Sequence, residues 1–409
     1  MILLAGQAFG PWSGPGVFSQ RLARGLVECG YEVTFVMPAT RFRHGRRCDH
    51  SGARIETVPS LSLGSFYPDV HVTPNAERSI EKLFDRLRPS IVHVQDHHAV
   101  SRGVVRAAAR RGVPVVATNH FLPGDLIPHV PVLSTFSLGR KILETILWRT
   151  VTDVFSAAQI VTTPTDTAAL IMRQKLEHIP IRAISNGVEL RRFHGRNGES
   201  VKAARFRFGL DSRQVLLLYL GRVDREKRLD VLIRALALSR RTDVQFAVAG
   251  QGRDVERLRD LAAALDLGHR VVFLGFVNDD ELPSLLRCAD LFAMPSDVEL
   301  QSIATLEAMA SGLPVLAADA GALPELVDNG VNGFLFRPCD PQDASRRLLQ
   351  ILHARQRWAK MGEESARRAR EHAIEQTISA YGSLYEELLS GRDEGQVIRV
   401  ASPVRSSGE

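Results

Sequence analysis

Two glutamates lie close together near residue 300. Glu299 is in a polar loop after the apolar run Leu291–Met294, and Glu307 lies inside a predicted helix, 302–311, that ends at Gly312. The helix around Glu307 is mostly apolar, so this carboxylate should have a partner or a ligand. Backbone N–H groups at a helix start bind anions. Together with the carboxylate of Glu299, they suit a ligand that carries anionic and hydroxyl groups, as a sugar nucleotide does.

A basic pair follows another apolar run. Arg222 and Lys227 lie five residues apart on the loop after Val215–Leu220, where an open α/β sheet presents ligand contacts. A fixed guanidinium and an ammonium can stabilise the charge that develops on a diphosphate leaving group without a metal. The alternative is a solvated basic loop.

The first half of the chain offers two weaker candidates. Gly16 ends a Gly/Pro-rich loop, 6–16, where backbone can approach a phosphate closely. The loop has no Walker Gly-Lys-Ser/Thr and lacks the third glycine of a dinucleotide fingerprint, so a tight turn packing Trp12 is the alternative. His120 follows the run Val113–Thr118, at the strand end where sites form, and is either structural or part of a ligand site.

A histidine-rich stretch lies between these two candidates. It contains His93, Asp96, His97 and His98, and metal binding is one interpretation. The spacing fits no standard binuclear hydrolase pattern, so we expect polar contacts on the acceptor side instead. Asp297-Val298-Glu299 mimics the acidic triplet of metal-dependent transferases but lies inside the two-glutamate segment. We therefore expect no metal.

Strand-like and helical runs alternate from end to end, which predicts doubly wound parallel α/β sheets. The expected strands of the first half are 2–5, 32–37, 91–94, 113–118, 160–163 and 181–184, and those of the second half are 215–220, 245–249, 271–274, 291–294 and 315–318. Each half therefore looks like its own Rossmann-type sheet.

The 409 residues are too many for one ordinary core and favour two domains. The Asn186-Gly187 turn marks the boundary, which gives an N-terminal domain, 1–187, and a C-terminal domain, 188–390. The last helices could also pack back on the first domain. Residues 391–409 are polar, and we expect a disordered tail.

Composition excludes several classes of protein. Hydrophobic residues make up 44% of the chain and charged residues 24%, an ordinary globular balance. No uncharged apolar run is long enough to span a bilayer, and the N-terminus has no basic leader. The four cysteines show no CxxC spacing, which suits a reducing compartment. We therefore expect a cytoplasmic protein.

The net charge of +6 lies entirely in the N-terminal half. Residues 1–190 hold 21 Lys and Arg against 15 Asp and Glu, and the remainder holds 31 of each. Such a half can meet an anionic membrane surface or a phosphorylated ligand, whereas no zinc-finger or RNA-binding signature supports nucleic acid. The basic residues in question are Arg41, Arg43, Arg46, Arg47, Arg102, Arg106, Arg110 and Arg111.

Four segments resemble a known family in its own order. The stretch from Glu299 through Glu307 to Ala-Met-Ala-Ser-Gly-Leu-Pro-Val resembles the signature of the retaining glycosyltransferases of the GT4 family, which have the GT-B fold. Ile184–Val188 resembles its domain-junction motif, Gly221–Lys227 its Gly-Arg…Glu-Lys element, and Ala249–Gly252 its second-sheet turn. The resemblance implies two Rossmann-like domains facing a central cleft, with residues 1–187 as the acceptor-binding domain and residues 188–390 as the nucleotide-sugar-binding domain.

The resemblance also implies roles for single residues. Arg222 and Lys227 would hold the donor diphosphate, Glu307 the ribose hydroxyls and Glu299 the transferred sugar, with His120 close to that sugar. Further donor contacts are implied at Gly16, Gly250, Val277, Gln301, Ser302 and Ile303. Many relatives have glycine at the position of Ser302, so this side chain narrows the pocket or adds a hydroxyl contact.

The implied reaction moves a hexose-type sugar from a UDP- or GDP-sugar to a hydroxyl acceptor, with no separate cofactor. Because of the basic first half and the apolar loop Phe121–Pro128, we expect a lipid-linked or membrane-facing acceptor and peripheral membrane association. A soluble acceptor such as an inositol, a saccharide or a secondary metabolite is the alternative. An NAD- or metal-dependent enzyme on tandem Rossmann sheets is a remote one.

Overall fold

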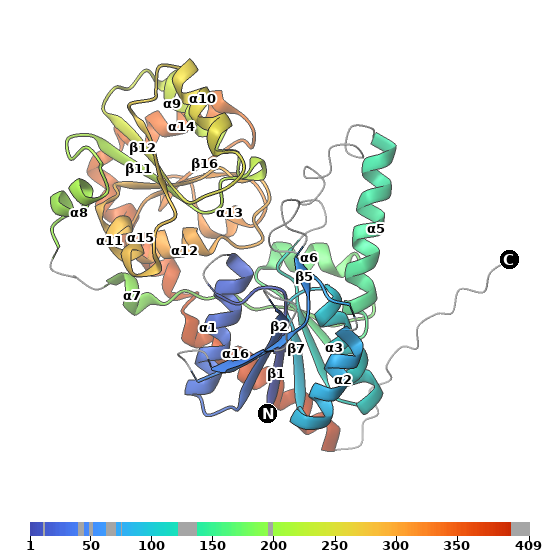
Figure 1. Cartoon of the computed structure of the whole chain (residues 1–409). Coiled ribbons are helices and arrows are strands. Elements are labelled where there is room, and N and C mark those ends of the chain that lie inside the picture. Colours follow the sequence, from blue (N-terminus) through green and yellow to red (C-terminus); the bar gives the residue numbers. More distant parts are fainter. Residues whose placement is uncertain are drawn as a thin grey trace. The chain divides into compact units, whose positions relative to one another are not determined.

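The protein forms two compact units in a computed structural model (Figure 1). The structure describes residues 1–10, 13–39, 45–48, 52–62, 71–74, 76–121, 137–194 and 199–393. The first unit comprises Met1–Ile184 together with the chain from Glu375 onward, and the second unit comprises Ser185–Ile374. The chain therefore passes between the units twice.

The first unit is built on a sheet in the order β10-β9-β8-β7-β1-β2-β4-β3, in which every neighbouring pair is parallel except β3 and β4. Its strands are β1 (Ile2–Ala5), β2 (Val33–Pro38), β3 (Gly45–Cys48), β4 (Arg54–Val58), β7 (Ile91–Val94), β8 (Val115–Thr118), β9 (Ile160–Thr163) and β10 (Ile181–Ala183). A separate antiparallel pair joins β5 (Leu61–Ser62) to β6 (His71–Val72). Strands β1, β7, β8 and β9 are buried throughout, because helices cover both faces of a parallel sheet.

Helices of the first unit lie on opposite faces of this sheet (Figure 1). Helices α2 and α3 pack together on one face, and α1 and α16 lie on the other, where Ile378 packs against Gly25. The bounds are α1 (Gly14–Glu28), α2 (Ala76–Leu87), α3 (Ala99–Arg111), α5 (Ser137–Phe155), α6 (Asp166–Arg173) and α16 (Ile374–Asp393). Helix α3 ends where Gly112 adopts a left-handed conformation, as helix ends often do.

The second unit has an all-parallel sheet in the order β13-β12-β11-β14-β15-β16. The strands are β11 (Val215–Leu220), β12 (Val244–Ala249), β13 (Val271–Gly275), β14 (Leu291–Met294), β15 (Val315–Ala318) and β16 (Gly333–Phe336). The α-helices are α7 (Leu190–His194), α8 (Val201–Arg207), α9 (Leu229–Ser239), α10 (Val255–Ala264), α11 (Leu282–Cys288), α12 (Ile303–Ala310), α13 (Leu323–Leu326), α14 (Pro341–His353) and α15 (Trp358–Arg370), with 3₁₀ turns η2 (Arg225–Lys227), η3 (Asp279–Glu281) and η4 (Arg355–Arg357).

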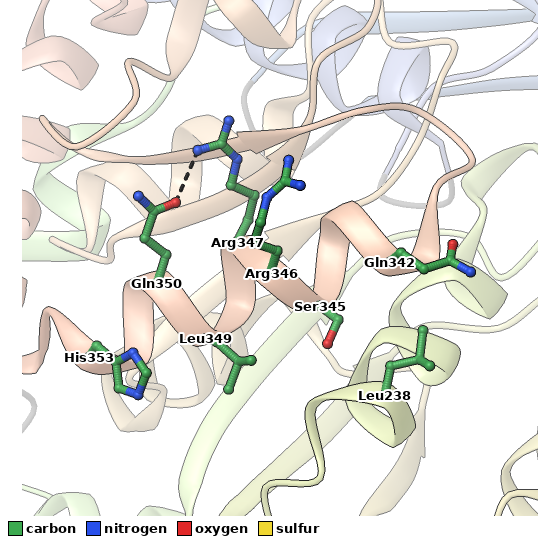
Figure 2. Close-up of a pocket in the computed structure, with 8 residues that line it drawn as sticks. All are labelled: Leu238, Gln342, Ser345, Arg346, Arg347, Leu349, Gln350 and His353. Carbon is green, nitrogen blue, oxygen red and sulfur yellow. Dashed lines mark hydrogen bonds between the residues drawn. The ribbon is translucent and has the colours of Figure 1, made fainter.

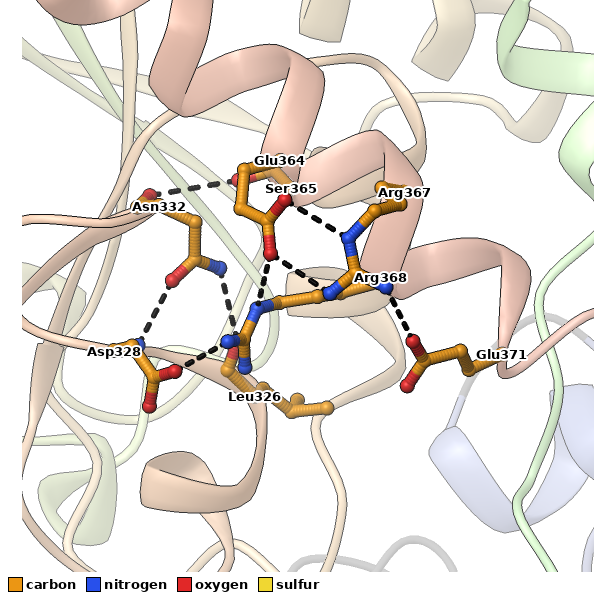
Figure 3. A network of polar contacts seen from close by, with 8 residues as sticks. All are labelled: Leu326, Asp328, Asn332, Glu364, Ser365, Arg367, Arg368 and Glu371. Atoms are coloured by element: carbon orange, nitrogen blue, oxygen red, sulfur yellow. Dashed lines mark hydrogen bonds and ion pairs between the residues drawn. The ribbon is translucent and has the colours of Figure 1, made fainter.

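A polar network fastens α15 to the loop between α13 and β16 (Figure 3). The guanidinium of Arg368 pairs with Asp328 and, at 3.2 Å, with Glu364. The side chain of Asn332 accepts from the backbone N–H of Asp328 at 2.8 Å and donates to the carbonyl of Leu326 at 2.9 Å. The C-terminal helices up to α15 thus complete the second unit.

Helix α16 belongs to the first unit, which corrects the domain bounds expected from the sequence. Tyr385 is buried, and its hydroxyl lies 2.7 Å from Nδ1 of His93; the Tyr381 hydroxyl lies 3.0 Å from Oγ1 of Thr162. These buried contacts place 375–390 on the first sheet instead of in the second domain. Residues 391–393 continue α16, and the rest of the predicted tail lies outside the described residues.

The predicted strands are all present, with ends shifted by at most two residues. The sequence interpretation missed β3 and β4, which extend the first sheet beyond β2, and β16 at the edge of the second. In the part of the chain that the structure describes, none of the helices is long and apolar enough to cross a membrane.

Candidate active site

The second sheet changes winding direction between β11 and β14. These strands are neighbours, and the order then runs β12, β13 on one side and β15, β16 on the other. Loops that leave two such strands turn to opposite sides, so their carboxyl ends frame a natural ligand site. The loop after β11 carries Arg222 and Lys227, and the loop after β14 carries Glu299.

Lys227 and Glu299 meet at this switch point. Nζ of Lys227 donates to Oε1 of Glu299 at 2.7 Å, and the two side chains are only 18% and 12% exposed. Burial alone would raise the pKa of Glu299, but the Lys227 ammonium and its hydrogen bond outweigh burial and lower that pKa. Glu299 is therefore a carboxylate at neutral pH.

Arg222 lies beside two buried acids. Its guanidinium is 2.9 Å from Oδ2 of Asp224 and 2.9 Å from Oε1 of Glu226, whereas half of the Arg222 side chain stays exposed. The hydroxyl of Tyr219 donates to the Arg222 carbonyl at 2.6 Å. The guanidinium is thus fixed in direction by the two acids, while its exposed part can still meet a ligand.

Glycines allow the loops around the site to approach one another. A Cβ on Gly250 would lie 1.8 Å from the carbonyl oxygen of Gly221, and both glycines have positive φ, 142° and 148°. A Cβ on Gly321 would lie 2.4 Å from the carbonyl oxygen of Glu299. Gly250 therefore shapes the loop by letting two backbones touch.

Helix α12 begins beside Glu299. Ser302 is its N-cap, and Oγ of Ser302 accepts from the backbone N–H of Thr305 at 3.1 Å and from the Thr305 hydroxyl at 2.8 Å. Ile303 is the first helical residue. The Ser302 hydroxyl, expected to touch the sugar, thus caps the helix.

Gln301 is tied to the start of the second unit. Its Oε1 accepts from the backbone N–H of Asn186 at 2.7 Å and from the hydroxyl of Ser185 at 3.2 Å. Nε2 of Gln301 is buried and has no hydrogen-bond partner among the described residues. One end of this amide therefore holds the junction, and the other end makes no hydrogen bond to the described residues.

Two other predicted donor contacts lie near the same edge. Glu307 is buried within α12, with 5% of its surface exposed. Val277 is partly buried after β13 and packs against the core of the second unit.

The first-unit candidates lie at the carboxyl edge of the other sheet. Nε2 of His120 is 2.9 Å from Oε1 of Gln95, and burial lowers the pKa of His120 to about 4, so the imidazole is neutral at pH 7. A Cβ on Gly16 would lie 2.5 Å from the carbonyl oxygen of Gly10, and the Gly10 N–H donates to the Gly16 carbonyl at 3.1 Å. Gly16 therefore closes a tight turn; Trp12 lies outside the described residues.

The histidine-rich stretch does not converge on a common point. His93 is fully buried between Tyr385 and Thr118, and burial lowers its pKa to about 3. His97 stacks on Phe121 with ring centroids 5.8 Å apart. Among the described residues, no group of three or more His, Cys, Asp or Glu side chains is placed to hold a metal ion.

The basic helix expected to attract lipid headgroups is neutralised by its neighbour. Arg106 and Arg110 of α3 pair with Glu77 and Glu81 of α2, and Arg111 pairs with Glu81 and Asp85. Since α2 and α3 pack together, these ion pairs link the two helices. Arg41 and Arg43, and the loop 122–128, lie outside the described residues.

Sequence reasoning missed the acidic partners around the basic pair. Asp224 and Glu226 lie within the segment that carries Arg222 and Lys227, yet only the folded structure shows that they pair with Arg222.

A hollow of about 630 Å³ lies between α9 and α14 (Figure 2). It is lined by Leu238, Arg346, Arg347 and His353 among others, and none of the predicted site residues lines it.

Comparisons with known proteins agree with this geometry. The family described as Glycosyltransferase Family 4 matches residues 12–192, and Glycosyl transferases group 1 matches residues 200–371. The structure of Anabaena Alr3699/HepE in complex with UDP and glucose has a TM-score of 0.74 at 20% identity and covers 94% of this chain and 99% of that chain. The chain therefore has the GT-B fold, and its two halves match models of glycosyltransferase families.

Curated relatives narrow this class. The chain is 31% identical over 334 residues to a D-inositol 3-phosphate glycosyltransferase of Mycolicibacterium vanbaalenii, which is 75% of this chain and 70% of that protein. It therefore belongs to glycosyltransferase family 4. It is 24% identical to the N-acetyl-alpha-D-glucosaminyl L-malate synthase of Bacillus anthracis, over 94% of this chain and 96% of that protein. The match to the Salinispora tropica D-inositol 3-phosphate glycosyltransferase, at 35% identity over 56% of this chain, spans only about half of that relative, 51%.

Proposed function

We propose that the protein moves a hexose-type sugar from a UDP-sugar to a hydroxyl group of a small soluble acceptor, with retention of configuration and without a metal. The observation that carries this proposal is the Lys227–Glu299 pair, 2.7 Å apart, beside the half-exposed guanidinium of Arg222 at the β11/β14 switch point. Arg222 and Lys227 hold the diphosphate of the donor, Glu299 holds the transferred sugar, and Glu307 holds the ribose.

The reaction follows from these positions. The bond from the anomeric carbon to the diphosphate oxygen breaks while the acceptor oxygen attacks on the same face, and the acceptor proton passes to the departing phosphate. Arg222 and Lys227 stabilise the negative charge that develops on the diphosphate, in place of a metal ion. His120, neutral at pH 7, offers a hydrogen bond to the sugar and does not act as a cation.

Two observations favour a soluble acceptor over a lipid. The relatives named above act, by their names, on inositol 3-phosphate and on malate. In addition, Arg106, Arg110 and Arg111 pair with acids of α2, so these arginines do not form a free basic surface. The UDP in the HepE structure supports a uridine donor.

A thermal-shift panel of UDP, GDP, ADP and NAD, with the common UDP- and GDP-sugars and with EDTA present, tests the donor. We expect UDP and one UDP-sugar to raise the Tm. Product analysis with inositol phosphate, malate and liposome-embedded lipid acceptors then tests the acceptor class. Stabilisation by NAD alone, or turnover that needs a divalent ion, would overturn the proposal.

A further inference from the structure

Three side-chain amides lie at the carboxyl edge of the first sheet with hydrogen-bonding atoms left unused. Gln7 follows β1, Gln95 follows β7 and Asn119 follows β8, and we call these three residues the amide row. Gln95 is 3% exposed and Asn119 is 2% exposed. Both amide atoms of Gln7, Nε2 of Gln95 and Nδ2 of Asn119 are buried without a hydrogen-bond partner among the described residues.

The amide row occupies the switch point of its sheet. Strands β2 and β4 lie on one side of β1, while β7, β8 and β9 lie on the other. The register pairs Ala5 with Val94 and Val94 with Ala117, so the residues that follow these strands come out side by side. This is the position where an open α/β sheet binds ligands.

The row is also held in place. The backbone N–H of Gln7 donates to Oδ2 of Asp96 at 2.5 Å, and the backbone N–H of Gln95 donates to the carbonyl of Ala5 at 2.8 Å. Oε1 of Gln95 is fixed by Nε2 of His120 at 2.9 Å. The unused atoms therefore belong to side chains whose positions are set by the sheet edge.

Leaving these atoms unpaired has a cost. Buried polar atoms are paired in the great majority of cases, and one left without a partner costs about 1–3 kcal/mol. Four such atoms on three adjacent strand ends are not explained by packing, because an apolar side chain of the same size would avoid the cost. A ligand that pairs them explains why they are polar.

The charges around the row select the kind of ligand. Asp96 is the acid at this edge, and its two oxygens already accept from the backbone N–H groups of Gln7 and His98 and from the Ser101 hydroxyl. His120 is neutral, with a pKa lowered by burial to about 4. Arg102 acts electrostatically on His97. The Asp96 carboxylate and the Arg102 guanidinium thus offset each other, and the neutral amides suit hydroxyl groups better than a phosphate.

We propose that the amide row binds hydroxyl groups of an uncharged polyol portion of the acceptor. This assignment rests on the proposed function, since it makes the row the acceptor half of the same reaction. Gln7 contributes one donor and one acceptor, and Gln95 and Asn119 contribute one donor each. Any anionic part of the acceptor lies away from the row.

Gln7→Met tests the row directly. It keeps the size of the side chain and removes two unpaired polar atoms, so we expect the Tm to stay unchanged or to rise, the acceptor KM to rise about tenfold and the donor KM to change less than about twofold. Gln245→Met is the matched control. Gln245 is a buried glutamine of the second unit whose Oε1 accepts from the backbone N–H of Asp211, so its loss should lower the Tm and leave the acceptor KM unchanged.

Binding separates this proposal from the proposed function. Titration of wild type and Gln7→Met with myo-inositol, glycerol and glucose, each with saturating UDP, needs no turnover. We expect a neutral polyol to bind wild type about tenfold more tightly than the variant. A wild-type protein that binds a polyol but consumes no nucleotide sugar would refute the proposed function alone.

Three results would overturn the assignment. The first is that no polyol binds wild type. The second is a rise in donor KM with unchanged acceptor KM, which would mean that the row holds the transferred sugar. The third is the same polyol affinity and KM values in both proteins, which would mean that the amides hold only water.

Discussion

The two sheets have the same topology around their switch points but opposite chemistry there. At β11/β14 the groups are charged and paired, as in Lys227 with Glu299 at 2.7 Å. At β1/β7 they are neutral amides, and several atoms of Gln7 and Gln95 have no partner among the described residues. The fold thus provides two equivalent positions, and the side chains decide what each can bind.

This difference has a physical origin. A partly buried charge without a partner is strongly destabilising, so a site for an anionic ligand must supply its own counter-ions while it is empty. The Lys227–Glu299 pair meets this requirement, because each charge has its partner in the absence of a ligand. A buried amide without a partner costs far less free energy than a buried charge, so an amide site can stay empty without a built-in partner.

Among the variants considered, Lys227→Ala should have the largest effect, and this effect is on turnover. We expect turnover to fall by about 100-fold or more, because the charge on the leaving diphosphate loses its ammonium. The pKa of Glu299 should also rise, since Lys227 lowers it while burial opposes. Steady-state rates with a UDP-sugar provide the measurement.

The exposed pair Arg241–Asp243 supplies the control for that variant. Arg241 is a surface arginine of the same unit, 2.5 Å from Asp243, and Arg241→Ala should leave turnover within about twofold. If Lys227→Ala retains activity within a few-fold of wild type, Lys227 does not hold the leaving group.

Gly250→Ala should have the next largest effect, on stability. The added Cβ would lie 1.8 Å from the Gly221 carbonyl oxygen at a φ of 142°, so we expect a loss of about 2–3 kcal/mol in the free energy of unfolding. Gly268→Ala is the matched control, because a Cβ there meets nothing within 4 Å. Equal urea midpoints for both variants would show that the loops around the donor site can separate freely.

Much of the donor edge could be predicted from the sequence. The apolar runs before Arg222 and Glu299 fix two strands, and residues directly after parallel strands gather at one edge. The pairing of Lys227 with Glu299 could not be predicted, because the residues are 72 positions apart and strand order decides that their loops are neighbours.

The acceptor edge shows where sequence reasoning fails. Gln7, Gln95 and Asn119 are ordinary polar residues at strand ends, and nothing in their types reveals that their amide atoms are buried and unpaired. The histidines drew attention instead, although His93 is a packing residue. The sequence pattern leaves open which domain the last helix joins, and the buried Tyr381 and Tyr385 of α16 fix it on the first unit.

Acidification should destabilise the first unit more than the second, by a smaller effect that grows gradually as the pH falls. Burial lowers the pKa of His93 to about 3 and that of His97 to about 4, whereas a histidine in the unfolded chain titrates near 6.5. Below pH 6.5 the unfolded first unit therefore takes up protons that the folded unit does not. The stabilisation that comes from keeping these histidines neutral is fully present above pH 6.5. The free energy of unfolding falls by about 1.4 kcal/mol per pH unit for each such histidine as the pH approaches 4.

Calorimetry between pH 7.5 and 5 checks this prediction. The Tm of the first unit should fall faster than that of the second. In the second unit burial also lowers the pKa of His372, which adds some acid sensitivity. Glu299 stays ionised over this range, because its own pKa is lowered. His93→Gln should be less stable at pH 7.5, since Tyr385 loses a well-fitted partner, but should show a shallower pH dependence. An unchanged slope in His93→Gln would mean that His93 does not cause the acid sensitivity, and parallel shifts of both transitions would remove the contrast between the two units.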